Sequence, residues 1–181
     1  YQDGTVASRM IVFKKTGMMN AISSMGAHYV DFEDLPPEIV NLNGELVKSV
    51  GIAKPIMEHR VINMPKLKTH VQALMTGAVK NIVMGSIQGS GKGAIHDIGR
   101  TPEKFGKALI DVYSALKPVI DLNIMDAIVC MEGNGPSNGS PKRLGRLVIG
   151  TDAVAVDMVA FRMAGVNPMR VPHINEEVKR S

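Results

Sequence analysis

The spacing of apolar and polar residues along the chain predicts an alternating order of strands and helices. Alternating residues on either side of Asn43-Gly44, a dipeptide typical of two-residue turns, predict a β-hairpin. Further strands are expected at 60–67, 119–131 and 146–151, and helices at 16–25, 71–84, 102–116 and 153–164. This order predicts an α/β fold: a layered, largely parallel or mixed sheet with helices on both faces, plus the hairpin.

Two glycine-rich segments are expected to be loops. "GSIQGSGKGAIHD", residues 85–97, does not match a phosphate-binding P-loop, because Gly91-Lys92 is followed by Gly93 where that motif needs Ser or Thr. It predicts instead a flexible cationic loop, which either approaches an anion or is simply solvated. "EGNGPSNGSPKRLG", residues 132–145, predicts a long shaped loop, because its prolines fix φ and its glycines permit positive φ.

The composition is that of a soluble globular protein, with 45% hydrophobic and 21% charged residues among 181. The length suits a single domain, 1–181, and the start at Tyr1 indicates a fragment of a longer chain. No segment has the length of a membrane span or the pattern of a signal peptide, so a cytoplasmic protein without a membrane partner is expected. The single cysteine, Cys130, excludes an internal disulfide and an iron–sulfur cluster held by this chain alone.

Positive charge is concentrated in one stretch. Residues 61–100 contain five lysines and arginines against the single acid Asp97, which accounts for the whole formal net charge of +4. This concentration favours an anionic ligand or partner. Nucleic acid is disfavoured, because no aromatic residue lies between Phe32 and Phe105 to stack on bases.

The candidate chemistry follows the predicted strands. Alternation in an extended segment places Lys66, Lys68 and His70 on one side, where the lysines face one anion or merely extend into solvent at a strand end. Lys80 lies late in a predicted helix, where the helix dipole alone also accounts for it. His96 beside Asp97 suits proton transfer or metal binding, although no metal-ligand spacing is present and the metal stays unknown.

Acidic residues cluster at two predicted strand ends and in one helix. Asp152 is expected to cap that helix. Asp157 lies in an apolar stretch and must have a partner, for which a lysine of the basic stretch is expected. Glu132 begins the 132–145 loop and is expected either to point into the site or to be exposed to water.

Several motifs, in this order, resemble those of the prokaryotic family named domain of unknown function 362: "NMPKLKTH", "TGAVKN", "GKGAIH", "MEGNGPSNGSP" and "IGTDAVAVDMVAFRMAG". The resemblance covers about residues 55–170. It implies an α/β domain, often fused to a ferredoxin-like module with two 4Fe-4S clusters, but implies no settled reaction. The early lysine-and-proline segment and the Cys-x-x-Cys series of such proteins are absent from this sequence. The motif positions are Lys66, Lys68, His70, Lys80, Asn81, His96, Glu132, Gly133, Asn134, Gly135, Pro136, Gly139, Asp152 and Asp157.

Two functions of different classes are expected. The first is a small-molecule site for a phosphate- or carboxylate-bearing anion, in which proton-transfer or metal-assisted chemistry takes place. Its catalytic candidates are His70, His96, Lys68 and Glu132, and its ligand-binding candidates are Lys66, Lys80, Asn81, Lys92, Asn134, Gly135, Asp152 and Asp157. The alternative is an electron-transfer or scaffold module whose basic face docks an acidic ferredoxin-type partner. The cofactor stays unknown.

Overall fold

The computed structural model describes residues 6–181, with side chains from residue 10 onward, and the chain forms two compact units, 1–31 and 32–181. In the first unit, helices α1 (Val6–Lys15) and α2 (Met18–Ser24) are joined at Gly17, whose φ of 76° favours glycine. Helix α2 confirms the helix expected at 16–25. All that follows concerns the second unit.

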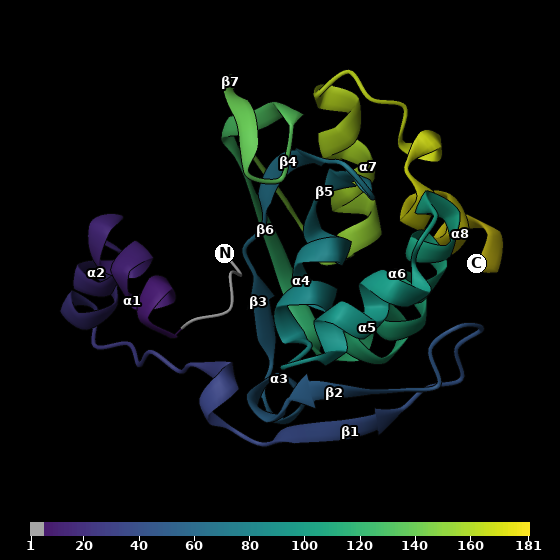
Figure 1. Cartoon of the computed structure of the whole chain (residues 1–181). Coiled ribbons are helices and arrows are strands. Elements are labelled where there is room, and N and C mark those ends of the chain that lie inside the picture. The colour runs from purple at the N-terminus through teal and green to yellow at the C-terminus, as the bar shows by residue number, and fades with distance from the viewer. Residues whose placement is uncertain (1–5) are drawn as a thin grey trace. The chain divides into compact units, whose positions relative to one another are not determined.

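The second unit contains a mixed five-stranded sheet, which confirms the expected α/β class (Figure 1). Its strands are β3 (Val61–Asn63), β4 (Lys66–His70), β5 (Leu74–Thr76), β6 (Ile120–Asn134) and β7 (Asn138–Gly150). Strands β3 and β4 both run parallel to β6, whereas β5 is antiparallel to β4 and β7 is antiparallel to β6. The ends of β4 and β6 therefore lie beside each other.

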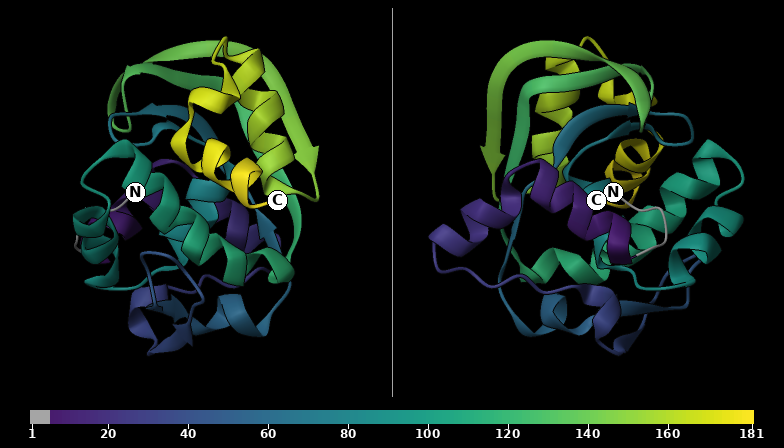
Figure 2. Two further views of the ribbon diagram at one scale, coloured as in Figure 1. Left: turned by 90° about the vertical axis from the view of Figure 1, so that its right-hand side faces the viewer. Right: turned by 60° about the vertical axis from the view of Figure 1, so that its left-hand side comes forward.

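Strands β6 and β7 form one long hairpin, seen as two adjacent green ribbons in Figure 2. The expectation of a loop is therefore wrong, because residues 132–145 are mostly paired strand. Cross-strand pairing continues to Asn134 opposite Asn138, which leaves only residues 135–137 for the connection. The glycines here permit close strand contact, because a Cβ on Gly139 would lie 2.4 Å from the Glu132 carbonyl oxygen.

The segment expected as one helix at 71–84 divides into strand β5 and helix α4 (Ala78–Ser86). The division falls at Gly77, where a Cβ would lie 2.1 Å from Asp157 Oδ1. The side chain of Asp157 binds the first backbone N–H groups of α4, so the helix begins at the residue after Gly77. Tertiary contact thus sets a helix start that local spacing does not indicate.

The glycine-rich segment at 85–97 is not a loop. It comprises the end of α4, a short link and helix α5 (Gly91–Ile98). Helix α5 is held against the core by its apolar side chain Ile95, which is buried. The link is bound from a neighbouring 3-10 helix, Phe32–Asp34: Glu33 accepts hydrogen bonds from the Gly89 amide and from Lys92.

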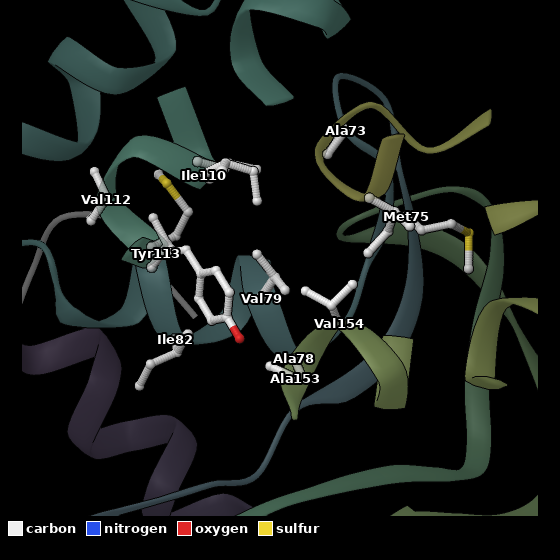
Figure 3. Close-up of a cluster of buried hydrophobic side chains, with 14 of the residues drawn as sticks. Ala73, Met75, Ala78, Val79, Ile82, Ile110, Val112, Tyr113, Ala153 and Val154 are labelled. Atoms are coloured by element: carbon white, nitrogen blue, oxygen red, sulfur yellow. The ribbon is translucent and has the colours of Figure 1, made fainter. Parts of the chain in front are cut away.

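Helices α6 (Pro102–Leu116) and α7 (Ala153–Met163) confirm two predicted helices and their caps. The Thr101 hydroxyl accepts from Lys104 N and the Asp152 carboxylate from Ala155 N. The helices pack with α4 against the sheet around a core that includes Val79, Ile110 and Val154 (Figure 3). Helix α8 (Pro172–Arg180) packs on α6, with Gly106 as the point of close approach to Pro172.

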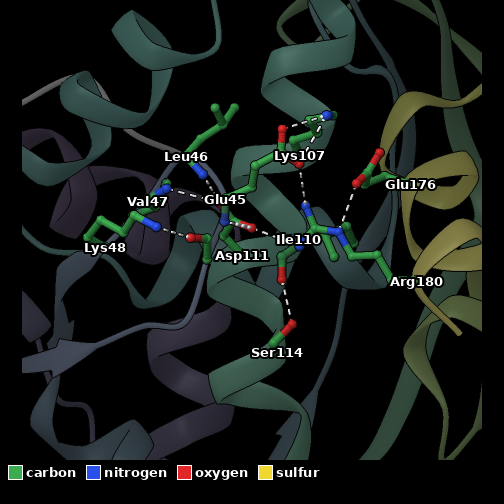
Figure 4. A network of polar contacts seen from close by, with 11 residues as sticks. Glu45, Leu46, Val47, Lys48, Lys107, Ile110, Asp111, Ser114, Glu176 and Arg180 are labelled. Atoms are coloured by element: carbon green, nitrogen blue, oxygen red, sulfur yellow. Dashed lines mark hydrogen bonds and ion pairs between the residues drawn. The ribbon is translucent and has the colours of Figure 1, made fainter.

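The expected hairpin is present, but its turn is longer than two residues. Strands β1 (Pro37–Asn41) and β2 (Ser49–Ala53) pair antiparallel, and residues 42–48 connect them. The cause is Asp111 of α6, whose buried carboxylate accepts hydrogen bonds from the amides of Glu45, Leu46 and Val47 (Figure 4). These bonds hold the connection open in place of a tight Asn43-Gly44 turn. The remaining described elements are helices α3 (Lys54–Glu58), Lys117–Val119 and Pro168–Arg170.

Candidate functional site

Three cationic or imidazole side chains lie around Phe105 at the start of α6, and a fourth, Lys68, interacts electrostatically with two of them. Strand β4 contributes Lys68 and His70, two residues apart and therefore on one side. Helix α4 contributes Lys80, whose Nζ lies 5.9 Å from the centre of the Phe105 ring, and α5 contributes His96. The rings of His70 and His96 both lie nearly parallel to Phe105, with centroids 6.4 and 5.0 Å away. We call Lys68, His70, Lys80 and His96 the cationic cluster.

Two members of the cationic cluster are buried, and the cluster contains no acid. Lys80 is 8% exposed and His70 9%, Lys68 is partly buried, and His96 is exposed. Among the side chains that the structure describes, no carboxylate forms an ion pair with Lys68 or Lys80. A buried ammonium group ordinarily has an acidic partner, because its desolvation is costly. This arrangement therefore suits an anionic ligand.

The electrostatics of the cluster follow from this burial. Desolvation, with a smaller contribution from the charge of Lys68, lowers the pKa of Lys80 to about 8. Desolvation also lowers the pKa of Lys68. The pKa of His70 is lowered to about 4, first by burial and then by the charges of Lys80, His96, Lys68 and His173. At neutral pH the lysines are therefore cationic and His70 is a neutral ring.

Hydrogen bonds assign the proton of each imidazole. His70 Nδ1 accepts from the amides of Gln72 (3.1 Å) and Ala73 (3.2 Å), so its proton is on Nε2. Gln72 donates its Nε2 to the Gly99 carbonyl, which directs Gln72 Oε1 toward His96 Nδ1 at 2.6 Å. His96 Nδ1 therefore carries the proton, and in the neutral ring its Nε2 holds a lone pair. The two histidines present opposite chemistry.

A buried histidine and acid lie next to the cluster. His173 of α8 is fully buried, and its Nε2 is 3.8 Å from Asp157 Oδ2. Neither nitrogen of His173 has a hydrogen-bond partner among the described residues, and the same holds for the buried hydroxyl of Thr76. An electrostatic interaction with His173 is among the smaller causes that lower the pKa of His70. Unpaired buried polar groups are uncommon and are typical of functional sites.

The expected lysine partner of Asp157 is wrong. Its carboxylate accepts hydrogen bonds from the amides of Ala78 and Val79, the latter at 3.1 Å. A carboxylate at a helix N-terminus is stabilised by these free N–H groups and by the helix dipole. Asp157 thus fixes the start of the helix that carries Lys80.

Asn81, which is exposed, binds a pair of buried amides on the parallel strands β3 and β6. Its Nδ2 donates to Asn63 Oδ1 at 2.8 Å, and Asn63 Nδ2 donates to Asn123 Oδ1 at 2.8 Å and to the Ala78 carbonyl at 3.0 Å. These bonds join β3, β6 and α4 beside the cluster. Asn81 thereby fixes the register of α4 and the position of Lys80, one residue away.

Four other candidate side chains have partners outside the cluster. Lys66 is exposed and pairs with Asp126 at 2.6 Å, and Lys92 pairs with Glu33 at 3.0 Å. Glu132 is exposed beside Lys142 of β7, at 3.3 Å. Asp152 caps α7 and lies 3.7 Å from Lys117. The structure therefore brings together Lys68, His70, Lys80 and His96. The side chains of Lys66, Lys92, Glu132 and Asp152 have their partners elsewhere.

The tip of the β6–β7 hairpin packs against the end of β4. The Gly135 carbonyl accepts from Val71 N at 3.3 Å, and Thr69 Oγ1 donates to the Gly133 carbonyl at 2.9 Å. A Cβ on Gly135 would lie 2.1 Å from the Thr69 carbonyl oxygen, so only glycine fits. Gly133 and Gly135 thus support the backbone on both sides of His70, whereas Asn134 pairs with Asn138 within the hairpin.

Sequence reasoning does not find Phe105, Gln72, Thr76 or His173. Phe105 and His173 lie outside the basic stretch and outside the quoted motifs, and Gln72 lies between two of those motifs. Thr76 begins the motif "TGAVKN", but nothing local indicates that its hydroxyl is buried without a partner. A separate pocket of about 280 Å³ is lined by later residues of α6, by Asn41–Gly44 and by Arg180. It does not include the cluster.

Comparison with known proteins identifies the family. The family model of Domain of unknown function (DUF362) matches residues 2–162, and the chain belongs to this family. The chain is also similar to the thylakoid-associated protein sll1697 of Synechocystis, with 39% identity over 113 residues. That match covers 62% of this chain and 34% of the relative, so the chain spans about a third of the relative's length. No solved structure matches.

Neither finding names a reaction or a ligand. None of the helices in the described part of the chain is both long and apolar enough to cross a lipid bilayer. Groups of three or more metal-binding side chains are also absent from that part. The chemistry must therefore be argued from the cationic cluster itself.

Proposed function

We propose that the second unit binds a small anionic ligand through a phosphate or carboxylate group held by the cationic cluster. Lys68 and Lys80 supply the charge, and the Nε2–H group of His70 supplies a directed hydrogen bond. The observation that carries the proposal is the buried ammonium of Lys80, which has no acidic partner among the described residues. A bound anion would supply the missing partner.

The geometry favours a small ligand over a docked protein. Lysines that dock an acidic ferredoxin-type partner are expected on an exposed face, where they steer association through water. Lys80 is buried, and Lys68 is partly buried beside it. An anionic group small enough to enter between β4, α4 and α5 fits this burial better.

Titration with inorganic phosphate and with acetate tests the proposal, by calorimetry and by NMR of the amides at 66–80. Removal of the charge in Lys80→Met or Lys68→Met is expected to weaken binding by about tenfold or more, the loss typical of a charge-assisted hydrogen bond. Lys66→Met is the matched control, because Lys66 lies on the same strand but is exposed and paired with Asp126. It should leave the affinity unchanged.

Two results would overturn the proposal. One is the absence of any response to either anion in the unmodified protein. The other is an equal loss of binding in Lys66→Met and Lys80→Met, which would indicate a general effect of surface charge. Circular dichroism of each variant confirms that it is folded before binding is measured.

A further inference from the structure

The two histidines of the cationic cluster make different demands on a ligand. His70 offers an N–H group, as the lysines do, because its Nδ1 is occupied by the amides of Gln72 and Ala73. His96 is reversed, because Gln72 Oε1 occupies its Nδ1 and leaves an unprotonated Nε2. That nitrogen makes no hydrogen bond to any described residue. Among the side chains of the cluster, it is the one acceptor.

The cluster therefore presents hydrogen-bond donors and one acceptor in addition to its positive charge. Two ammonium groups and one imidazole N–H can only donate, and any oxyanion satisfies them. His96 is exposed, so water can donate to the lone pair at its Nε2 in the free protein, and a ligand that replaces this water matches the site only if it donates a hydrogen in return. Nearby Lys80 and partial burial both lower the pKa of His96, which favours the neutral ring and preserves this lone pair at neutral pH.

We infer that His96 is a specificity-determining residue, which selects an oxyanion that carries its own O–H group over one that carries none. This inference rests on the proposed function and names its ligand class more closely. Inorganic phosphate is the simplest such ligand, since every form of it at neutral pH keeps at least one O–H. A 2-hydroxycarboxylate has the same chemistry, with the hydroxyl next to the carboxylate.

Gln72 is the positioning residue in this scheme. A flip of the Gln72 side-chain amide would place its oxygen against the Gly99 carbonyl oxygen, which repels it. Gln72 Oε1 therefore stays toward His96. The chain from Gly99 through Gln72 to His96 therefore fixes the tautomer. Stacking on Phe105, with the two ring planes 17° apart, holds the imidazole in the same orientation.

Sulfate provides the decisive comparison, because it resembles phosphate in shape but carries no hydrogen at neutral pH. Calorimetric titration of the folded chain is expected to give an affinity about tenfold higher for phosphate than for sulfate, the value of one hydrogen bond. Glycolate against acetate is the second pair. Preference within the first pair alone identifies phosphate as the ligand type, and preference within the second alone identifies a 2-hydroxycarboxylate.

His96→Phe keeps a ring against Phe105 and removes both nitrogens. It is expected to lower the affinity for phosphate about tenfold and to leave sulfate unchanged, so that the preference disappears. His59→Phe is the matched control, because His59 is an exposed histidine between α3 and β3. It should keep the preference of the unmodified protein.

The outcomes separate the two proposals. If sulfate and phosphate bind equally, and glycolate and acetate also bind equally, the inference fails while the proposed anion site stands. If no anion binds, the proposed function itself fails. Imidazole nitrogen NMR provides a test without ligand: the spectra should show His96 protonated at Nδ1 and His70 at Nε2. The opposite tautomer at His96 would overturn the inference.

Discussion

Helix α6 contacts two charged regions that differ in how their charges are satisfied. Near the middle of the helix, the Asp111 carboxylate accepts three backbone hydrogen bonds and forms an ion pair with Arg180 at 2.8 Å. Near its start, Phe105 lies beside Lys80, which has no acidic partner among the described residues. Both charged groups are buried, but among the described residues only the first has a group that compensates its charge.

This difference distinguishes a structural charge from one available to a ligand. Hydrogen bonds to the charged form, including that from Arg180, lower the pKa of Asp111 although burial opposes them. At Lys80, burial and a neighbouring cation both act against the charged form. The Asp111 region is therefore expected to stabilise the fold, whereas the uncompensated ammonium of Lys80 is expected to reduce stability, and under the proposed function a bound anion would offset this. Four changes test this contrast, beginning with the largest expected effect.

Asp111→Ala is expected to lower the free energy of unfolding by about 3–5 kcal/mol, because it leaves three amides and a partly buried Arg180 without their acceptor. Urea denaturation measures the loss. Asp121→Ala is the control, since Asp121 pairs with Arg60 at the surface and its removal should cost much less than that of Asp111. Equal losses in both variants would show that Asp111 has no special structural role.

Lys80→Met is expected to act in the opposite direction. Without ligand it should raise the free energy of unfolding by about 1–3 kcal/mol, since it removes a buried, uncompensated charge and keeps an apolar chain of similar length. The same denaturation experiment tests this at neutral pH. A loss of stability would mean that the fold compensates this ammonium group in another way, and the contrast with Asp111 would then fail.

The two regions are expected to lose their contributions to stability in different pH ranges. The folded pKa of His70 is about 4 against an ordinary value of 6.5, so the unfolded chain binds this proton first as the pH falls. The contribution of neutral His70 to the free energy of unfolding is therefore fully present above pH 6.5 and is lost as the pH falls toward about 4. Asp111, whose pKa lies below its ordinary 3.8, loses its contribution only under more acidic conditions.

The variant His70→Asn tests the contribution of His70 in the range between pH 6.5 and 4. The Asn oxygen can accept the amides of Gln72 and Ala73 as Nδ1 does, but it does not titrate. We expect the variant to reduce the loss between pH 6.5 and 4 by about 1–2 kcal/mol, a value discounted for partial solvent access. Thermal melts across this range provide the measurement, and an unchanged profile would exclude His70 as its source.

The sequence predicts the parts of the fold that local chemistry controls. Thr101-Pro102 and Asp152 start α6 and α7 where expected, because a helix cap is a local interaction. The start of α4 is not predictable in this way, because its capping group, Asp157, comes from 79 residues away. The 42–48 connection is likewise held open by Asp111, which is 64 residues from Val47 in the sequence.

The same distinction applies to the candidate site. Lys68, His70, Lys80 and His96 are identifiable because they share one basic stretch and follow recognisable motifs. Their proximity to Phe105 and His173 depends on how α6 and α8 pack, which no local pattern specifies. The hydrogen-bond roles of the two histidines likewise depend on the conformation of Gln72 and on Gly99.

The smallest effect is expected for Glu132→Gln, which tests whether the hairpin contributes charge or only shape to the site. The Glu132 side chain is 54% exposed, and its carboxylate lies 3.3 Å from Lys142, which is 55% exposed. Pairs in water gain little, because solvent screens the attraction and both chains lose rotamer freedom. We expect a change in unfolding free energy below about 0.5 kcal/mol, reduced further by salt, and an unchanged affinity for phosphate. A marked loss of phosphate binding would instead extend the site to the hairpin, and the separation between compensated and available charges would have to include Glu132.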